Sequence, residues 1–303
     1  SPYAKLAVKG VAGEIPFAVS SSTDENLFSI NQRGVATFGT SSTANIFING
    51  GGTSSPFLTQ NNVAIGNNSL VSYTTGASNN IALGSSALSG STTEFMTGSG
   101  NFAGGGSALA RNSSGSFNNA IGYLALFNNS TGSGNNALGH FALINNYGGS
   151  GNNALGDQAL TNNSSGSYNN ALGYQSLYNN TIGSDNTAFG YQSLYQNTTG
   201  IANSAIGNSA LKNNITGSNN IANGNFTLLN ATSTSNNIAF GPQALRGTST
   251  GYVSGENNFA AGNSALYSFT SGANNVAIGS STLYSNTNGS GNTAIGRLAL
   301  FFN

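Results

Sequence analysis

The chain has no cysteine and no tryptophan, one histidine, and only four prolines among its 303 residues. Without cysteine it forms no disulfide framework and no thiolate metal site. Charged residues make up only 5% of it, seven acidic against seven basic, whereas ordinary globular domains have roughly 25%. Because the chain has so few basic residues, it cannot form a basic surface for phosphates. We therefore expect no nucleic-acid partner. No apolar run approaches the ~20 residues of a membrane helix, so we expect no membrane insertion of this segment.

What the chain does contain is a repeat that reads Asn-x-Ala-apolar-Gly-x-x-small-Leu and occurs fourteen times. Successive motif glycines are mostly 17 residues apart, with one step of 18 and two of 21. They are Gly66, Gly84, Gly105, Gly122, Gly139, Gly156, Gly173, Gly190, Gly207, Gly224, Gly241, Gly262, Gly279 and Gly296. A short fixed period predicts a solenoid in which each repeat makes one coil, so function is expected on a long regular surface.

Three columns of the repeat are invariant when positions are counted from the motif glycine as position 0. Position −4 is always Asn, −2 always Ala and +4 always Leu. We expect the Asn side-chain amides to bond to the copies above and below, as stacked amides do in cross-β structures. The residues predicted to form this structural framework include Asn118, Asn135, Asn152, Asn169, Asn186, Ala120, Ala137, Ala154, Leu126, Leu143 and Leu160.

Strand is favoured over helix because each unit has a central Gly, a second Gly seven residues earlier in many repeats, and Asn pairs. The prediction is an all-β parallel β-solenoid with two short strands and two turns per coil. The invariant Leu and the apolar column at −1 are expected to fill the interior. At the ~4.8 Å spacing of strands, the repeats would extend over roughly 65 Å.

The chain divides into two predicted regions, a small β module at 1–58 and the solenoid at 59–303. In the first, Lys5-Leu-Ala-Val-Lys9 and Pro16-Phe-Ala-Val-Ser20 are typical of strands. Residues 26–39 predict a hairpin that turns near Arg33-Gly34, since apolar residues alternate on both sides. The module is too short for much of a core, so we expect it to cap or connect. The opening Ser-Pro-Tyr suggests a processed piece of a longer protein.

More than one chain is expected because Ala at −2 and the apolar residue at −1 point to opposite faces of a strand. Partner chains could cover the second face, with Ala letting backbones approach closely. The alternative is a strand that bends at the Gly and places both columns inside one coil. Position +5 adds a further stripe of large apolar residues, which a monomer rarely leaves bare: Phe127, Ile144, Tyr178, Tyr195, Leu229, Tyr267, Tyr284 and Phe301.

The segments Asn62-Val-Ala-Ile-Gly66 and Asn275-Val-Ala-Ile-Gly279 resemble the head repeats of YadA-like trimeric autotransporter adhesins. The resemblance covers residues 59–303. It implies a left-handed parallel β-roll of three chains, displayed outside the cell to bind host or matrix surfaces. The 17-residue period is longer than the family's usual repeat, and no binding residue carries over. Residues 28–39 look like segments of tail-fibre-like proteins, which often end in a self-cleaving chaperone; that would explain an end at Asn303.

We expect no catalysis, no metal site and no cofactor. His140 lies in the tolerant column +1, which favours a solvent-facing side chain, and the acids are too scattered for a general acid and base. The exposed candidates are aromatic, because a tyrosine combines a flat apolar face with a hydroxyl. They could bind sugars, or else fill a subunit interface or shield a coil edge: Tyr123, Tyr174, Tyr178, Tyr191, Tyr195, Tyr267 and Tyr284.

Together these features favour a non-enzymatic, extracellular or cell-surface fibre segment that displays a repetitive surface to a host-surface or glycan receptor. We expect a homo-oligomer, with a trimer favoured. The alternative is the subunit of a self-assembling filament without a specific ligand, joined end to end through an open coil edge after Arg297. An ice-binding solenoid is disfavoured, because the column at −3 varies from Val63 and Phe102 to Asn119 and Ser204 instead of repeating Thr.

Overall fold

The computed structural model describes the strand backbone at residues 17–20, 26–30, 36–38 and 46–48, and the chain at 62–70, 77–90, 96–248 and 253–303. Three strands near the N-terminus form an antiparallel sheet in the order β1-β2-β3: Phe17–Ser20, Asn26–Ile30 and Ala36–Phe38. The predicted strand at 16–20 and the hairpin are therefore confirmed. The predicted strand at 5–9 and the turn at Arg33-Gly34 lie outside the described residues.

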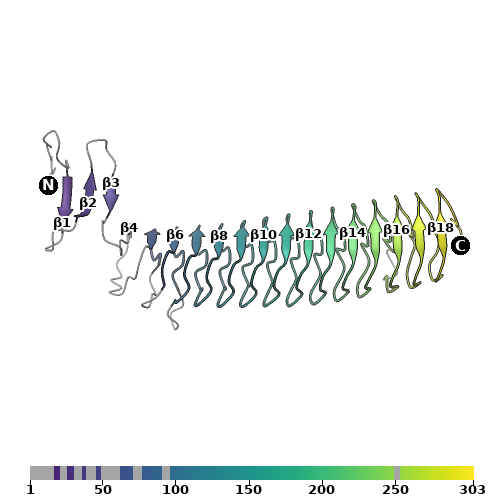
Figure 1. The fold of residues 1–303 in the computed structure, drawn as a ribbon, viewed down its shortest axis with the longest axis horizontal. Coiled ribbons are helices and arrows are strands. Elements are labelled where there is room, and N and C mark those ends of the chain that lie inside the picture. The colour runs from purple at the N-terminus through teal and green to yellow at the C-terminus, as the bar shows by residue number, and fades with distance from the viewer. Residues whose placement is uncertain are drawn as a thin grey trace.

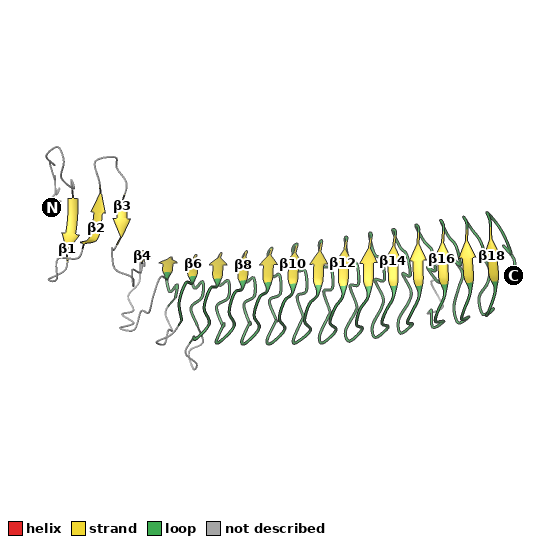
Figure 2. Cartoon of the chain, viewed as in Figure 1, coloured by secondary structure: helices red, strands yellow, loops and turns green. Residues whose placement is uncertain are grey.

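The repeats form one parallel sheet that runs in chain order from β4 to β18 (Figures 1 and 2). Its first strand, β4 at Ile46–Ile48, pairs with β5, so the sheet begins before the first repeat motif. Each of the fourteen repeats then contributes one three-residue strand, and these fourteen strands enclose thirteen turns of the solenoid. In chain order, β5 to β18 are Val63–Ile65, Ile81–Leu83, Phe102–Gly104, Asn119–Ile121, Asn136–Leu138, Asn153–Leu155, Asn170–Leu172, Thr187–Phe189, Ser204–Ile206, Ile221–Asn223, Ile238–Phe240, Phe259–Ala261, Val276–Ile278 and Thr293–Ile295.

Each coil has one strand, so the prediction of two strands per coil is wrong for the described repeats. After the motif Gly the sign of φ alternates along the backbone. It is positive at positions +2 and +4, as in Leu124 (58°) and Leu126 (52°). Alternating φ signs cannot make a pleated strand. The turns are still joined from coil to coil, since Leu126 N donates to Ala142 O at 3.0 Å. Such bonds hold residues in a conformation that costs about 1–2 kcal/mol each.

The core is a thin double column of small and medium side chains. Ala at −2 stacks on Ala in register, as Ala137, Ala154 and Ala171 do across neighbouring strands, and these side chains are buried. The Leu at +4 is likewise buried in Leu126, Leu143 and the other inner coils. The apolar residue at −1 faces solvent instead, so the prediction that it fills the interior is wrong. A three-residue strand alternates faces, and Ala at its centre takes the inner one.

The predicted ladder at position −4 is confirmed. Asn135 Nδ2 donates to Asn118 Oδ1 at 3.1 Å, and the backbone N–H of Asn135 donates to the same oxygen at 2.9 Å. The pattern continues from Asn80 to Asn292. Because these amides lie in the interior, each bond also removes the cost of an unpaired buried polar group.

A second buried ladder lies at position +7, and it was not predicted. Asn129 Nδ2 donates to Asn112 Oδ1 at 2.7 Å and to Gly132 O at 2.9 Å. Asn118 of the same coil donates to that carbonyl as well, at 2.9 Å. In each coil that carries the second ladder, the two amide columns therefore donate to the same glycine carbonyl. The second ladder consists of Asn112, Asn129, Asn146, Asn163, Asn180, Asn197 and Asn214.

The motif glycine is required by both its backbone angle and its neighbour. Gly122 has a φ of 140°, and a Cβ built on it would lie 2.4 Å from Gly139 O in the next coil. The same close approach recurs at Gly139 against Gly156. A side chain at this position would have to push the coils apart, so the glycine column fixes the spacing of the solenoid.

Candidate functional site: the exposed columns of the solenoid

The outer face of the parallel sheet carries an exposed apolar column at position −1. These side chains are 36–44% exposed from Ile65 to Ile278, with interruptions at Gly104, Asn223 and Ala261. The strand therefore presents opposite faces, as predicted, and the alternative in which both columns lie inside the coil is wrong. Ala at −2 occupies the interior, so it is not the column that a partner chain could approach.

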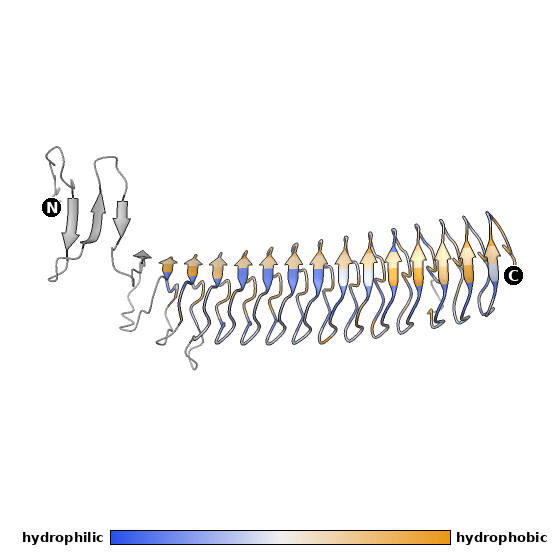
Figure 3. Cartoon of the chain, in the orientation of Figure 1, coloured by the Kyte–Doolittle hydropathy of each residue, from blue (hydrophilic) through white to orange (hydrophobic). Residues whose placement is uncertain are grey.

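The neighbouring column at −3 divides the same face into three segments. It is apolar from Val63 to Phe102 and from Ile221 to Val276, and it is polar between these segments and again at Thr293 in the last strand. Figure 3 shows this change, with orange at β5 to β7 and at β14 to β17, and blue from β8 to β11. In the polar segment Asn119, Asn136, Asn153 and Asn170 form a ladder with Nδ2–Oδ1 distances of 2.7–2.8 Å. This outer ladder was also missed, because its asparagines do not recur in every repeat.

The candidate tyrosines form stacked pairs that follow the coil spacing. The Tyr174 and Tyr191 rings stack at a centroid distance of 5.5 Å, and the Tyr178 and Tyr195 rings at 5.3 Å. Tyr267, Tyr284 and Phe301 make a three-ring stack with distances of 4.9 Å. Tyr123 stacks on His140 at 5.5 Å and is 54% exposed.

This stacking limits what the tyrosines can offer to a ligand. A ring that stacks on the next coil uses its π face within the chain, so its edge and hydroxyl are what remain for solvent. Tyr174 and Tyr191 are exposed, whereas Tyr178, Tyr195, Tyr267 and Tyr284 are half-buried. The ladders therefore support the reading that these rings shield coil edges, and sugar stacking on their faces is restricted.

Three cations lie over aromatic rings of column +5. Arg111 lies over the Phe127 ring at 4.8 Å, Lys212 Nζ over Tyr195 at 5.9 Å, and Arg246 over Tyr267 at 5.4 Å. A cation over a ring face is attracted by its quadrupole, with about 0.5–1 kcal/mol at exposed sites. These contacts place three of the chain's few basic side chains on one side of the rod.

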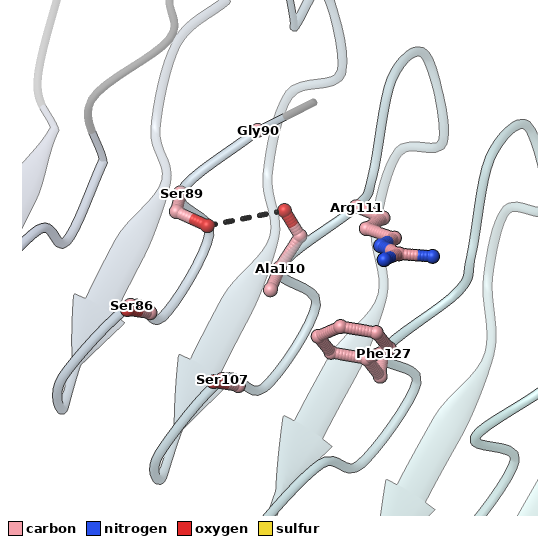
Figure 4. A pocket seen from close by; sticks show the side chains of 7 residues that line it. All are labelled: Ser86, Ser89, Gly90, Ser107, Ala110, Arg111 and Phe127. Carbon is pink, nitrogen blue, oxygen red and sulfur yellow. Dashed lines mark hydrogen bonds between the residues drawn. The ribbon is translucent and has the colours of Figure 1, made fainter. Parts of the chain in front are cut away.

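Two hollows of about 440 Å³ each lie beside this side of the rod. The first is lined by Ser86, Ser89, Gly90, Ser107, Ala110, Arg111 and Phe127 (Figure 4). In it Arg111 Nη1 donates to Asn128 Oδ1 at 3.1 Å, and Ser89 Oγ donates to Ala110 O at 3.3 Å. Gly90 leads directly into residues 91–95, which the structure does not describe.

The second hollow lies between positions +6 and +8 in the middle of the solenoid. It is lined by Asn162, Asn179, Thr181, Gln196, Thr198 and Ile215. These residues come from four successive repeats, so the hollow runs along the rod rather than into it. Every residue on its rim is described.

The sole histidine makes one ionic contact. His140 Nδ1 lies 3.7 Å from Asp157 Oδ1, with about half of each side chain exposed to water (47% and 48%). The solvent-facing position predicted for His140 is thus confirmed. Neither residue lines one of the two hollows. Over the described ranges, no group of three or more His, Cys, Asp or Glu side chains could hold a metal ion. The same residues contain no helix that could cross a lipid bilayer.

Comparison of the chain with protein-family models, with curated proteins and with solved structures found no match.

Proposed function

We propose that this chain is a non-enzymatic structural segment of an extracellular adhesive fibre. Its mechanism is mechanical display, in which stacked coils make a stiff rod that holds a repetitive surface away from its point of attachment. The single observation that carries the proposal is the uninterrupted stack of fourteen repeat strands, bonded in register from β5 to β18. Continuous backbone and amide ladders couple each coil to its neighbours, so the stack resists bending and local opening.

The partner that best fits the exposed face is another copy of the same chain. The −1 column presents an apolar side chain in most coils along the sheet, with interruptions at Gly104, Asn223 and Ala261. A partner that contacts every coil must repeat with the same spacing, and a second solenoid of this sequence does so. The resemblance to YadA-like head repeats favours three chains side by side, in a left-handed roll. A trimer would cover an apolar face that monomers seldom leave bare.

The oligomeric state is tested by light scattering of the purified chain with serial dilution. A stable mass of three chains supports the trimeric fibre. A mass that grows with concentration favours the end-to-end filament, and a monomer at all concentrations contradicts the proposal. Attachment is tested separately, by coating beads with the rod and counting their adhesion to glycan- and matrix-coated surfaces against beads coated with an inert protein.

A further inference from the structure

A ladder of side-chain amides on the outside of the solenoid is broken at one coil. At position +6, Asn128 Nδ2 donates to Asn145 Oδ1 at 2.9 Å, and the chain of bonds continues to Asn162 and Asn179 at 3.2 Å each. It resumes with Asn213 Nδ2 donating to Asn230 Oδ1 at 3.1 Å.

Gln196 occupies the position between the two ladder segments. Its longer side chain bonds to neither neighbour, so Asn179 Nδ2, the Gln196 amide and Asn213 Oδ1 make no side-chain hydrogen bond among the described residues. Hydrogen-bonding capacity that the other coils use internally is free here.

This break coincides with the second hollow, which Asn179 and Gln196 both line. The hollow is also lined by Thr181 and Thr198, whose hydroxyls donate to Thr198 O and Ile215 O at 2.9 and 3.0 Å, and by Ile215, which is 40% exposed. The lining of this shallow hollow therefore combines free amide groups with apolar surface. A sugar has the matching chemistry, since it carries hydroxyls around its ring and C–H groups on its faces.

A cation lies next to the same coil. Gln196 N donates to Lys212 O at 2.9 Å, and the Lys212 ammonium lies over the ring of Tyr195, the residue before Gln196. The structure assigns Lys212 no carboxylate partner, because the ion pair within the described ranges joins His140 and Asp157. An ammonium that lies over a ring and has no carboxylate partner among the described residues can bind a carboxylate from outside.

We propose that the hollow around Gln196 binds an oligosaccharide that carries carboxylate groups, with Asn179 and Gln196 bonding to hydroxyls and Lys212 to a carboxylate. This inference rests on the adhesive function proposed above and names the class of ligand. The hollow draws on four successive repeats of one chain. A linear saccharide lying parallel to the rod axis can therefore occupy it, and no partner chain has to complete the site.

The test measures binding of a fluorescent oligogalacturonate to the full chain by fluorescence anisotropy, with the methyl-esterified oligomer as the neutral probe. We expect binding of the acidic probe and at least tenfold weaker binding of the ester. Gln196→Asn restores the residue that forms the ladder elsewhere, so it closes the free amides; binding should weaken at least tenfold while the melting temperature stays equal or rises. Lys212→Gln should also weaken binding at least tenfold.

Two variants serve as controls. Arg297→Gln removes an exposed cation elsewhere, and Asn128→Gln breaks the same ladder at its bond to Asn145, neither of which lines the hollow; both variants should bind as the parent chain does. Equal binding of the ester, unchanged binding by Gln196→Asn, or no binding of either probe to the parent chain would overturn the inference. A rod that forms trimers but binds no saccharide contradicts this inference alone, whereas a monomer that binds the acidic probe contradicts the trimeric fibre alone.

Discussion

Asn118 and Asn135 lie one coil apart, and Asn118 Oδ1 accepts two hydrogen bonds from Asn135, from its backbone N–H at 2.9 Å and from its side-chain Nδ2 at 3.1 Å. Asn135 Oδ1 in turn accepts the same two bonds from Asn152. Each buried amide therefore satisfies a main-chain donor of the next coil as well as its own side chain. The ladder therefore links successive coils inside the solenoid. Its contribution to stability follows from the buried donors that would be left unpaired without it.

Asn135→Ala should be strongly destabilising for this reason. It leaves the backbone N–H of Asn152 without its acceptor in the interior. It also removes the side-chain bonds of Asn135 to Asn118, Asn152 and Gly149 O, although Gly149 O keeps its second donor, Asn146. An unpaired buried group costs about 1–3 kcal/mol and each lost bond about 1 kcal/mol, so we expect a loss of roughly 3–5 kcal/mol in the free energy of unfolding. The measurement is urea unfolding, followed by the far-ultraviolet circular dichroism of the full chain.

Asn136→Ala is the matched control, since it removes the neighbouring asparagine from the outer ladder. Asn136 is half-buried and bonds to Asn119 and Asn153, where water can replace the lost partners. A loss below about 1 kcal/mol is expected. Equal effects of the two variants would contradict the interior role of position −4.

The invariant columns allowed the framework to be predicted, because an invariant Asn, Ala, Gly and Leu at a fixed period leave few structures that bury them all. It was harder to predict which columns face the interior and which face solvent. The −1 residues look like core by hydropathy, yet a coil that already encloses Ala137 and Leu143 with two amide columns has no room for them. Volume, rather than hydropathy, decides that face.

The functional surface could be predicted less well, for a physical reason. At the break in the ladder, Gln196 replaces an asparagine with an amide side chain that is one methylene longer. Such a substitution hardly changes the composition or the periodicity of the sequence. The effect of this substitution is visible only in the structure, where Asn179 Nδ2 and Asn213 Oδ1 lack the ladder hydrogen bonds that other coils make. The positive φ at Leu124 and Leu126 was likewise invisible, because such angles in leucine arise from inter-coil bonds rather than from local preference.

Gly122→Ala should break the coil spacing. The added Cβ would meet Gly139 O at 2.4 Å in a backbone conformation that L residues rarely adopt. Gly134→Ala is the control, since Gly134 also has a positive φ, of 67°, but nothing lies within 4 Å of its Cβ. The control should lose about 1–2 kcal/mol from strain alone, and Gly122→Ala clearly more. Thermal unfolding of both variants side by side measures the difference, and a similar melting temperature would contradict the steric argument.

The stability of the rod should depend little on pH or salt. The buried polar side chains of the described residues are Asn, Ser and Thr, none of which titrates. The His140–Asp157 pair is half-exposed, and such pairs contribute about 0–1 kcal/mol. We therefore expect the urea midpoint, read from the tyrosine signal, to stay constant between about pH 4 and pH 9, where ordinary carboxyl and imidazole groups titrate. A midpoint that shifts with the uptake of one proton would reveal a buried titratable group.

The double variant Leu155→Lys, Leu172→Lys should separate the chains without unfolding them. Both leucines stand at −1 on the outer face, with 37% and 44% of the side chain exposed, and neither belongs to the interior columns. In the proposed trimer they would face partner chains, where an unpaired buried ammonium is strongly unfavourable. Light scattering should therefore change from three chains to one, with the circular dichroism spectrum unchanged. A double substitution Thr199→Lys, Asn208→Lys on other exposed positions is the control and should leave the mass at three chains. If the leucine variant keeps the mass of three chains, the −1 column is not the subunit interface, and the trimer must form through another face of the rod.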